Sequence, residues 1–127
     1  MRVLITGGPR TGKTTLGNTL QTQHEIPCMH TDDAIEGRSW SEASAEVARW
    51  LERDNEEFLI EGVAIPRALR KFMKAHPGER PCDELIVRSN TFSDLSKGQL
   101  AMTKGLHTVL AEILPELERL GVKVTRS

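Results

Sequence analysis

Short apolar runs alternate with longer amphipathic stretches along the 127-residue chain. The runs have the length of buried strands, and the stretches between them repeat their apolar positions at helical spacing. Five strands are predicted in this way, at residues 2–6, 26–30, 58–60, 84–87 and 122–124. Alternating strands and helices are typical of an open parallel sheet with helices on both faces. The pattern therefore predicts a single α/β domain over residues 1–127, with a three-layer α/β/α architecture.

Local signals indicate where the longer helices begin and end. Ser39 with Glu42, and Ser96 with Gln99, have the spacing of a capping box, so a helix is predicted to begin behind each serine. Pro115 falls within the second of these helices and is expected to kink or divide it.

Two further prolines and a glycine refine this picture. Pro27 predicts that the second strand lies at an edge of the sheet, because proline cannot donate a hydrogen bond to a neighbouring strand. Pro66 is suited to the first turn of a helix that runs to about Ala75. Gly121 fits the C-terminal cap of the last helix, just before the fifth strand.

The segment between the first strand and the first helix carries the strongest chemical signal. Residues 7–14 read GGPRTGKT and match the phosphate-binding pattern G-x-x-x-x-G-K-[ST] at every fixed position. Glycines let the backbone turn its N–H groups towards phosphates, and the start of the helix adds partial positive charge. The candidate nucleotide-binding residues are Gly7, Gly8, Pro9, Arg10, Thr11, Gly12, Lys13, Thr14 and Thr15.

This motif, with a strand before it and a helix after it, resembles the P-loop NTPase superfamily. The resemblance implies a P-loop fold with ATP and Mg²⁺ as cofactors. Lys13 would reach the β- and γ-phosphates, Thr14 would hold Mg²⁺ through its hydroxyl, and Thr15 would contact the α-phosphate.

An acidic residue ends the third strand, where Phe58-Leu59-Ile60 is followed by Glu61 and Gly62. In the P-loop fold this strand commonly lies beside the P-loop strand and ends in an acidic residue that binds Mg²⁺ or positions water. Glutamate in place of the usual aspartate resembles the strand end of several nucleoside and small-metabolite kinases. The alternative is an exposed carboxylate at a strand end without a functional role.

Asp32 and Asp33 follow the second strand. In kinases of this superfamily an acid here often orients the acceptor hydroxyl or takes its proton. Either residue is a candidate for that base, with Asp33 preferred, and Asp32 is also a candidate Mg²⁺ ligand beside Thr14 and Glu61. The alternative is that one aspartate caps the following turn.

The helix after Glu61 has a basic face. Arg67, Arg70, Lys71 and Lys74 gather opposite its apolar side. Arg67, near the helix start, is the best candidate to meet a polyphosphate or a phosphate-bearing acceptor. The whole face could instead follow a nucleic-acid backbone, or be an ordinary solvated surface.

Charge and composition indicate which partners and which cellular compartment to expect. The formal net charge is −1, which does not favour general attraction to nucleic acid or membrane. Residues 31–62 hold ten acidic and three basic side chains, whereas residues 63–80 hold five basic and one acidic. No segment resembles a signal peptide or approaches the roughly 18 apolar residues of a membrane span, and the two cysteines are expected to be reduced. A cytoplasmic protein is therefore expected, in the host cytoplasm if the gene is viral.

Taken together, these features favour a kinase that transfers the γ-phosphate of ATP to a hydroxyl group. The interval at 89–96 has no arginine, whereas nucleotide kinases usually carry an arginine-bearing lid there. Its replacement would be Arg88, Lys97 or a group of the partner molecule. The segments TDD at 31–33, IEGVAIPRALR at 60–70 and KGQ…KG at 97–105 are similar to compact bacteriophage P-loop kinases. Those enzymes phosphorylate 5-hydroxymethyluracil in DNA during base hypermodification. That resemblance implies a nucleoside-type acceptor within DNA, with Trp40 as the candidate for base stacking. The alternatives are a kinase of a free nucleoside or small metabolite, and a non-kinase ATPase or regulatory nucleotide-binding protein.

Overall fold

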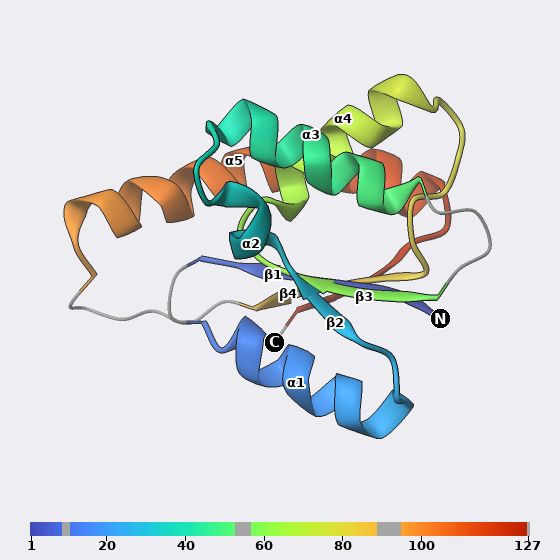
Figure 1. The fold of residues 1–127 in the computed structure, drawn as a ribbon. Coiled ribbons are helices and arrows are strands. Elements are labelled where there is room, and N and C mark those ends of the chain that lie inside the picture. The colour runs from blue at the N-terminus through green and yellow to red at the C-terminus, as the bar shows by residue number, and fades with distance from the viewer. Residues whose placement is uncertain (9–10, 53–56, 89–94, 127) are drawn as a thin grey trace.

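The computed structural model describes residues 1–8, 11–52, 57–88 and 95–126, which form one α/β/α sandwich (Figure 1). Its centre is a five-stranded sheet in the order β2-β3-β1-β4-β5, and every neighbouring pair is parallel. The strands are β1 Arg2–Gly7, β2 Cys28–His30, β3 Phe58–Glu61, β4 Glu84–Arg88 and β5 Lys123–Arg126. The predicted architecture is confirmed, and β2 lies at an edge as Pro27 predicted.

Helices cover both faces of the sheet. One face is covered by α1, and the other by α3, α4 and α5, while the short α2 continues directly from β2 (Figure 1). The helices are α1 Lys13–His24, α2 Thr31–Ile35, α3 Trp40–Leu51, α4 Ile65–Ala75 and α5 Lys97–Arg119. The carboxyl ends of β1, β2 and β3 therefore lead into α1, α2 and the β3–α4 turn, which is where ligands bind in open parallel sheets.

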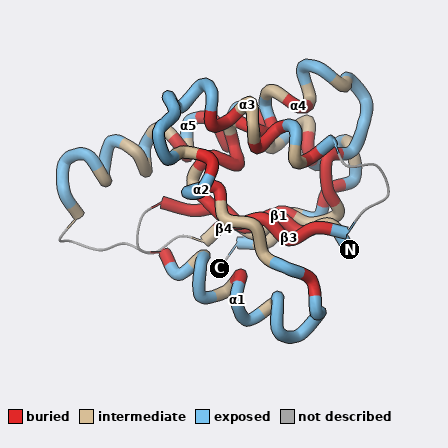
Figure 2. The backbone as a smooth tube through the Cα atoms, in the orientation of Figure 1, coloured by how far each residue is buried: buried red, intermediate tan, exposed pale blue. Residues whose placement is uncertain are grey.

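Two apolar cores follow from this layering (Figure 2). The larger lies between the sheet and helices α3, α4 and α5, and includes Leu69, Leu85 and Leu117, all fully buried. The smaller lies under α1 and is built on Val3, Ile5, Ile26 and Leu59. The buried strands β1 and β3 are apolar on both sides because each face is covered, as parallel sheets require.

The predicted helix caps form as expected. The hydroxyls of Ser39 and Ser96 accept from the backbone N–H groups of Glu42 and Gln99, and both capping boxes are complete. Pro115, however, does not divide α5, which runs as one element to Arg119. The lost hydrogen bond costs about 3 kcal/mol in an isolated helix interior. The apolar stripe of α5 continues past the proline, and its packing on the core offsets that cost.

Helix α2 was not predicted. It begins at Thr31, immediately after β2, so Asp32 and Asp33 lie in its first turn rather than capping it. Thr31 is buried against the β3–α4 turn, where a Cβ atom added to Gly62 would lie 1.6 Å from the Thr31 hydroxyl oxygen. Gly62 has φ +150°, so both its conformation and its neighbour exclude a side chain.

Candidate active site

The phosphate loop connects β1 to α1. Gly7 is the last residue of β1, and Gly12 precedes α1 with φ 80°, a left-handed conformation that favours glycine. The Lys13 ammonium donates to the Gly8 carbonyl at 3.2 Å, and the Thr11 hydroxyl donates to the same oxygen at 2.9 Å. Lys13 is therefore folded back over the loop, where a phosphate would lie. Pro9 and Arg10, the other predicted loop residues, fall outside the described residues.

The first turn of α1 completes the predicted nucleotide site. Thr14 and Thr15 lie in that turn, and both are exposed. No acidic residue occupies the first turn, and no side chain caps the helix start. Its N–H groups and partial positive charge are thus directed at solvent in the manner of an anion-binding helix start.

Two glycines of the loop are required by neighbouring elements as well as by the turn itself. A Cβ atom on Gly7 would lie 2.5 Å from the Arg88 carbonyl oxygen at the end of β4. A Cβ atom on Gly8 would lie 2.6 Å from the Thr103 hydroxyl oxygen of α5. The loop is thus closely packed between β4 and α5.

Arg88 brings a cation to the loop. Its Nε donates to the Thr11 carbonyl at 3.2 Å, and one of its terminal nitrogens would lie 3.3 Å from a Cβ atom on Gly12. Sequence reasoning named Arg88 as one replacement for a missing lid arginine. The structure places it beside the phosphate loop, whereas most of the interval that follows it, residues 89–94, lies outside the described residues.

Glu61 lies at the junction of β1, β2 and β3. It pairs in register with Ile5 on one side and with His30 on the other, and it is only 2% exposed. His30 Nδ1 lies 2.6 Å from Glu61 Oε1. The expectation that β3 lies beside the P-loop strand is confirmed, but the exposed carboxylate considered as an alternative is wrong, because Glu61 is buried and paired.

The residues around Glu61 fit a magnesium ion. A Cβ atom on Gly17 would lie 3.4 Å from Cγ of Glu61, so the stem of the Glu61 side chain packs against α1 one turn beyond Thr14. A threonine hydroxyl and a nearby carboxylate, completed by phosphate oxygens and water, are ligands typical of Mg²⁺. Asp32, the third predicted ligand, is exposed in α2. Among the described residues, no three histidine, cysteine, aspartate or glutamate side chains cluster as a metal site.

Cys28, like Glu61, lies against Gly17 of α1. Its sulfur would be 2.8 Å from a Cβ atom on Gly17. Burial, and then the charge of Glu61, raise the pKa of the Cys28 thiol to about 11. Cys28 is therefore a neutral thiol at physiological pH, and its titration reports on the charge of Glu61.

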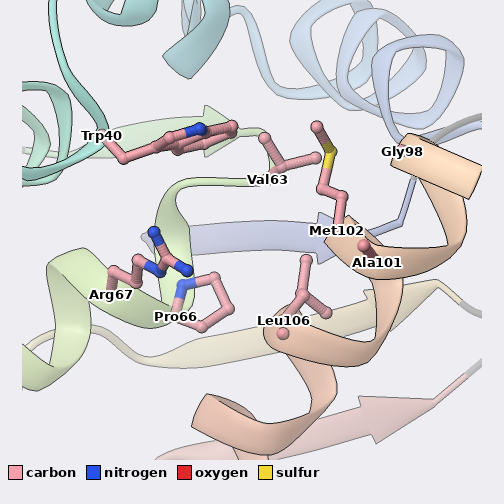
Figure 3. A pocket seen from close by; sticks show the side chains of 9 residues that line it. Trp40, Val63, Pro66, Arg67, Gly98, Ala101, Met102 and Leu106 are labelled. Atoms are coloured by element: carbon pink, nitrogen blue, oxygen red, sulfur yellow. The ribbon is translucent and has the colours of Figure 1, made fainter.

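A cavity of about 300 Å³ lies against helix α5 (Figure 3). Three segments form it: the start of α3, the turn from β3 into α4, and the first half of α5. Its lining residues are Trp40, Val63, Pro66, Arg67, Gly98, Ala101, Met102, Gly105 and Leu106. The Arg67 guanidinium stacks under the Trp40 indole, with Cζ 5.6 Å from the ring centroid. Trp40 remains 39% exposed. The cavity thus combines apolar walls with one cation, a composition typical of small-ligand sites.

The cavity and the phosphate loop share two elements. On α5, Met102 lines the cavity while the next residue, Thr103, packs on Gly8. At the end of β3, Val63 lines the cavity two residues beyond Glu61. Sequence reasoning found Arg67 and Trp40 but missed the contribution of α5, because nothing in residues 98–106 indicates what they face.

The basic face of α4 is divided among different partners. Arg67 faces the cavity, Arg70 Nη1 pairs with Glu112 of α5 at 3.1 Å, and Lys71 donates to the Ser41 carbonyl and hydroxyl of α3 at 2.8 and 3.2 Å. Lys74 is exposed. The four cations therefore do not form one uniform solvated stripe.

Comparison with solved structures gives a fold. No family model and no curated protein matches the chain. A solved gluconokinase from Sinorhizobium meliloti superposes with a TM-score of 0.59 at 14% identity, over 98% of this chain and 80% of that one. A shikimate kinase from Bacteroides thetaiotaomicron matches with a TM-score of 0.47 at 17% identity, over 98% and 84% of the two chains.

The chain has the P-loop NTPase fold. This follows from the gluconokinase superposition together with the strand order and the glycine loop between β1 and α1. Within the described part of this P-loop domain, no helix is long and apolar enough to cross a membrane.

Proposed function

We propose that this P-loop protein is an ATP- and Mg²⁺-dependent kinase that transfers the γ-phosphate to a hydroxyl of a nucleoside-type acceptor. The observation that carries the proposal is the pairing of two sites. A phosphate loop and a separate acceptor-sized cavity both lie against helix α5. Hydrolysis alone needs only a nucleotide and water, whereas transfer needs a second compartment next to the terminal phosphate.

The residues around the loop would bind and orient the nucleotide. Phosphoryl transfer depends mostly on positioning and on neutralising charge that spreads over the phosphate oxygens. Lys13 would contact the β- and γ-phosphates, and Arg88 would brace the loop through the Thr11 carbonyl. Bound Mg²⁺, held through Thr14 and Glu61, would neutralise phosphate charge.

The acceptor hydroxyl would be oriented by an aspartate of α2. Asp33 is proposed as the base and Asp32 as the alternative, since both are exposed at the carboxyl end of β2. A carboxylate there can accept the hydroxyl proton as the bond to phosphorus forms. Arg67, beneath Trp40, would hold the acceptor in the cavity.

The most specific acceptor we propose is the 5-hydroxymethyl group of 5-hydroxymethyldeoxyuridine in phage DNA. The exposed Trp40 indole supports it, because an aromatic face at a cavity rim can stack on a base turned out of a duplex. A free nucleoside or a small polyol is the second candidate. Residues of three segments surround the cavity, and the gluconokinase has the same fold.

Transfer of γ-labelled phosphate tests the proposal. ATP and Mg²⁺ would be incubated with hydroxymethyluracil-containing DNA, unmodified DNA, free nucleosides and gluconate in parallel, with Lys13→Ala as the inactive control. Label on one class of acceptor identifies the substrate. Release of free phosphate without a labelled acceptor would favour an ATPase or regulatory protein and contradict the kinase proposal.

A further inference from the structure

A second cavity, of about 390 Å³, adjoins the Trp40 cavity on the side away from Val63 and Met102. Its lining residues are Ser41, Ser44, Arg67, Arg70, Lys71, Gly105, Thr108 and Val109. Of these, three are cations and three carry hydroxyls, and no acidic side chain lines the cavity among the described residues. The two cavities therefore differ in charge: one cation lines the first cavity, and three cations line the second.

Arg67 and Gly105 belong to both cavities. A Cβ atom added to Gly105 would lie 3.9 Å from an Arg67 guanidinium nitrogen. Because Gly105 has no side chain, α5 leaves the space beside that guanidinium open. A ligand can therefore extend from one cavity into the other along Arg67.

The cations of the basic cavity keep capacity to bind an anion. Arg70 is bound to Glu112 through Nη1, but a guanidinium has five N–H donors. Lys71 gives two hydrogen bonds to Ser41, and an ammonium has three donors. Those bonds to Ser41 and Glu112 also fix both side chains in place, which lowers the entropy cost of binding a ligand there.

Phosphate is the anion that this set fits best. Guanidinium groups bind phosphate oxygens through paired, charge-assisted hydrogen bonds, whereas the Ser44 and Thr108 hydroxyls already donate to the Ser41 and Lys104 carbonyls. We infer that the acceptor is a phosphate ester of a nucleoside, whose phosphate binds among Arg67, Arg70 and Lys71 while its hydroxyl-bearing ring occupies the Trp40 cavity. This inference rests on the proposed kinase function and narrows its substrate class.

Calorimetric titration in the absence of ATP tests the inference without relying on catalysis. The probes are 5-hydroxymethyldeoxyuridine, its 5′-monophosphate, and a short single-stranded oligonucleotide that contains the same base. The wild-type protein should bind the monophosphate at least about tenfold more tightly than the nucleoside, as charge-assisted hydrogen bonds allow. Tighter binding of the oligonucleotide than of the monophosphate would indicate a polynucleotide as the source of the phosphate. Equal binding of the oligonucleotide and the monophosphate would indicate a free nucleotide.

Variants test whether the basic cavity is responsible. Arg70→Gln should reduce the preference for phosphate to about threefold or less, while leaving affinity for the nucleoside unchanged. Arg119→Gln is the matched control, because Arg119 also forms an exposed ion pair, with Glu116, but lies at the far end of α5. Lys71→Gln with Lys123→Gln as its control gives a second pair in case Arg70→Gln does not fold.

Labelled-phosphate transfer to the same three probes separates the two proposals. Equal affinity for nucleoside and monophosphate would overturn the inference, and so would equal losses in Arg70→Gln and Arg119→Gln. Transfer to the nucleoside as efficient as to its monophosphate would retain the kinase and overturn the phosphate requirement. A phosphate preference that Arg70→Gln removes, without transfer to any probe, would support the anion-binding cavity and contradict the kinase function.

Discussion

The Nδ1 atom of His30 lies 2.6 Å from Oε1 of Glu61, although the two residues are 31 positions apart in the chain. They are register partners at the carboxyl ends of β2 and β3. A carboxylate as buried as that of Glu61 needs a hydrogen-bond partner to remain in place. His30 thus fixes the orientation of the acid that the fold presents towards α1.

Replacing His30 should show whether it orients the Glu61 carboxylate or only packs against it. His30→Leu would leave the Glu61 oxygen without its donor, which costs about 1–3 kcal/mol for a buried polar group. His30→Gln can still donate and should retain most of the stability. Denaturant unfolding measures the stability of each variant. The Mg²⁺ dependence of ATP binding measures whether Glu61 keeps its orientation. Equal behaviour of the two variants would show that the hydrogen bond does not position Glu61.

Lys13→Ala should abolish phosphate transfer. The ammonium lies over the loop through its bond to the Gly8 carbonyl, and its loss removes the charge opposite the β- and γ-phosphates. A decrease in kcat of at least about a hundredfold is expected, by analogy with the loss of one transition-state donor. Steady-state kinetics measure it, and an unchanged unfolding midpoint would exclude a folding defect. Full activity in this variant would contradict the nucleotide site.

Asp32→Asn and Asp33→Asn should behave differently. The variant that lacks the base should lose about 10²–10⁴ in kcat while its affinity for ATP stays unchanged. The other variant should retain most of its turnover, unless it also weakens Mg²⁺ binding. Parallel measurement of kcat and of nucleotide dissociation constants distinguishes these roles. Comparable loss of ATP affinity in both variants would indicate a role in metal binding or folding instead.

Gly8→Ala should loosen the contact between the phosphate loop and α5. The new Cβ atom would lie 2.6 Å from the Thr103 hydroxyl oxygen, and overpacking of this kind costs about 1–3 kcal/mol. Thr103→Ala removes that oxygen, so the double variant should recover part of the stability and of the ATP affinity. A double-mutant cycle measures the coupling. Additive effects would mean that the two residues do not constrain each other.

Cysteine alkylation should report on Glu61. Burial, with the Glu61 charge as a second cause, raises the pKa of Cys28 from 9.0 to about 11, and burial raises that of Cys82 from 9.0 to about 12. Both thiols should therefore react slowly with iodoacetamide at pH 8. Glu61→Gln removes the negative charge, so Cys28 should react faster while Cys82 does not change. Mass spectrometry identifies the modified residue.

The same thiols predict loss of stability in alkali. Their folded-state pKa values are raised, so the neutral thiols favour the folded state fully below pH 9.0. That contribution is lost progressively as the pH rises towards about 11 for Cys28 and about 12 for Cys82. Cys82→Ala should remove its share of this pH dependence. An unchanged slope in that variant would contradict the account.

Features of this protein that depend on neighbouring positions could be predicted from its sequence. The strands follow from short apolar runs, the two capping boxes from residues three positions apart, and the phosphate loop from contiguous residues. The five-residue helix α2 was missed because it is too short to show a helical period. Pro115 does not divide α5, because packing on the core outweighs a local preference.

Features that depend on the order of strands and on helix packing could not be predicted. The pairing of His30 with Glu61 requires knowing that β2 lies beside β3. The period of α4 placed its cations on one face, but it could not reveal that Glu112 and Ser41 lie opposite Arg70 and Lys71. The Trp40 cavity combines three separate segments, and no single segment carries its signature.

Helix α5 connects the Trp40 cavity with the phosphate loop. Met102 lines the cavity, and its neighbour Thr103 packs against Gly8 of the phosphate loop. An acceptor that shifts this turn of the helix must alter the packing on the loop, and a nucleotide that reshapes the loop must alter the cavity wall. Thermodynamic reciprocity makes the two effects equal, so each substrate changes the affinity for the other by the same factor. Synergy between the substrates would therefore depend on a single helical turn.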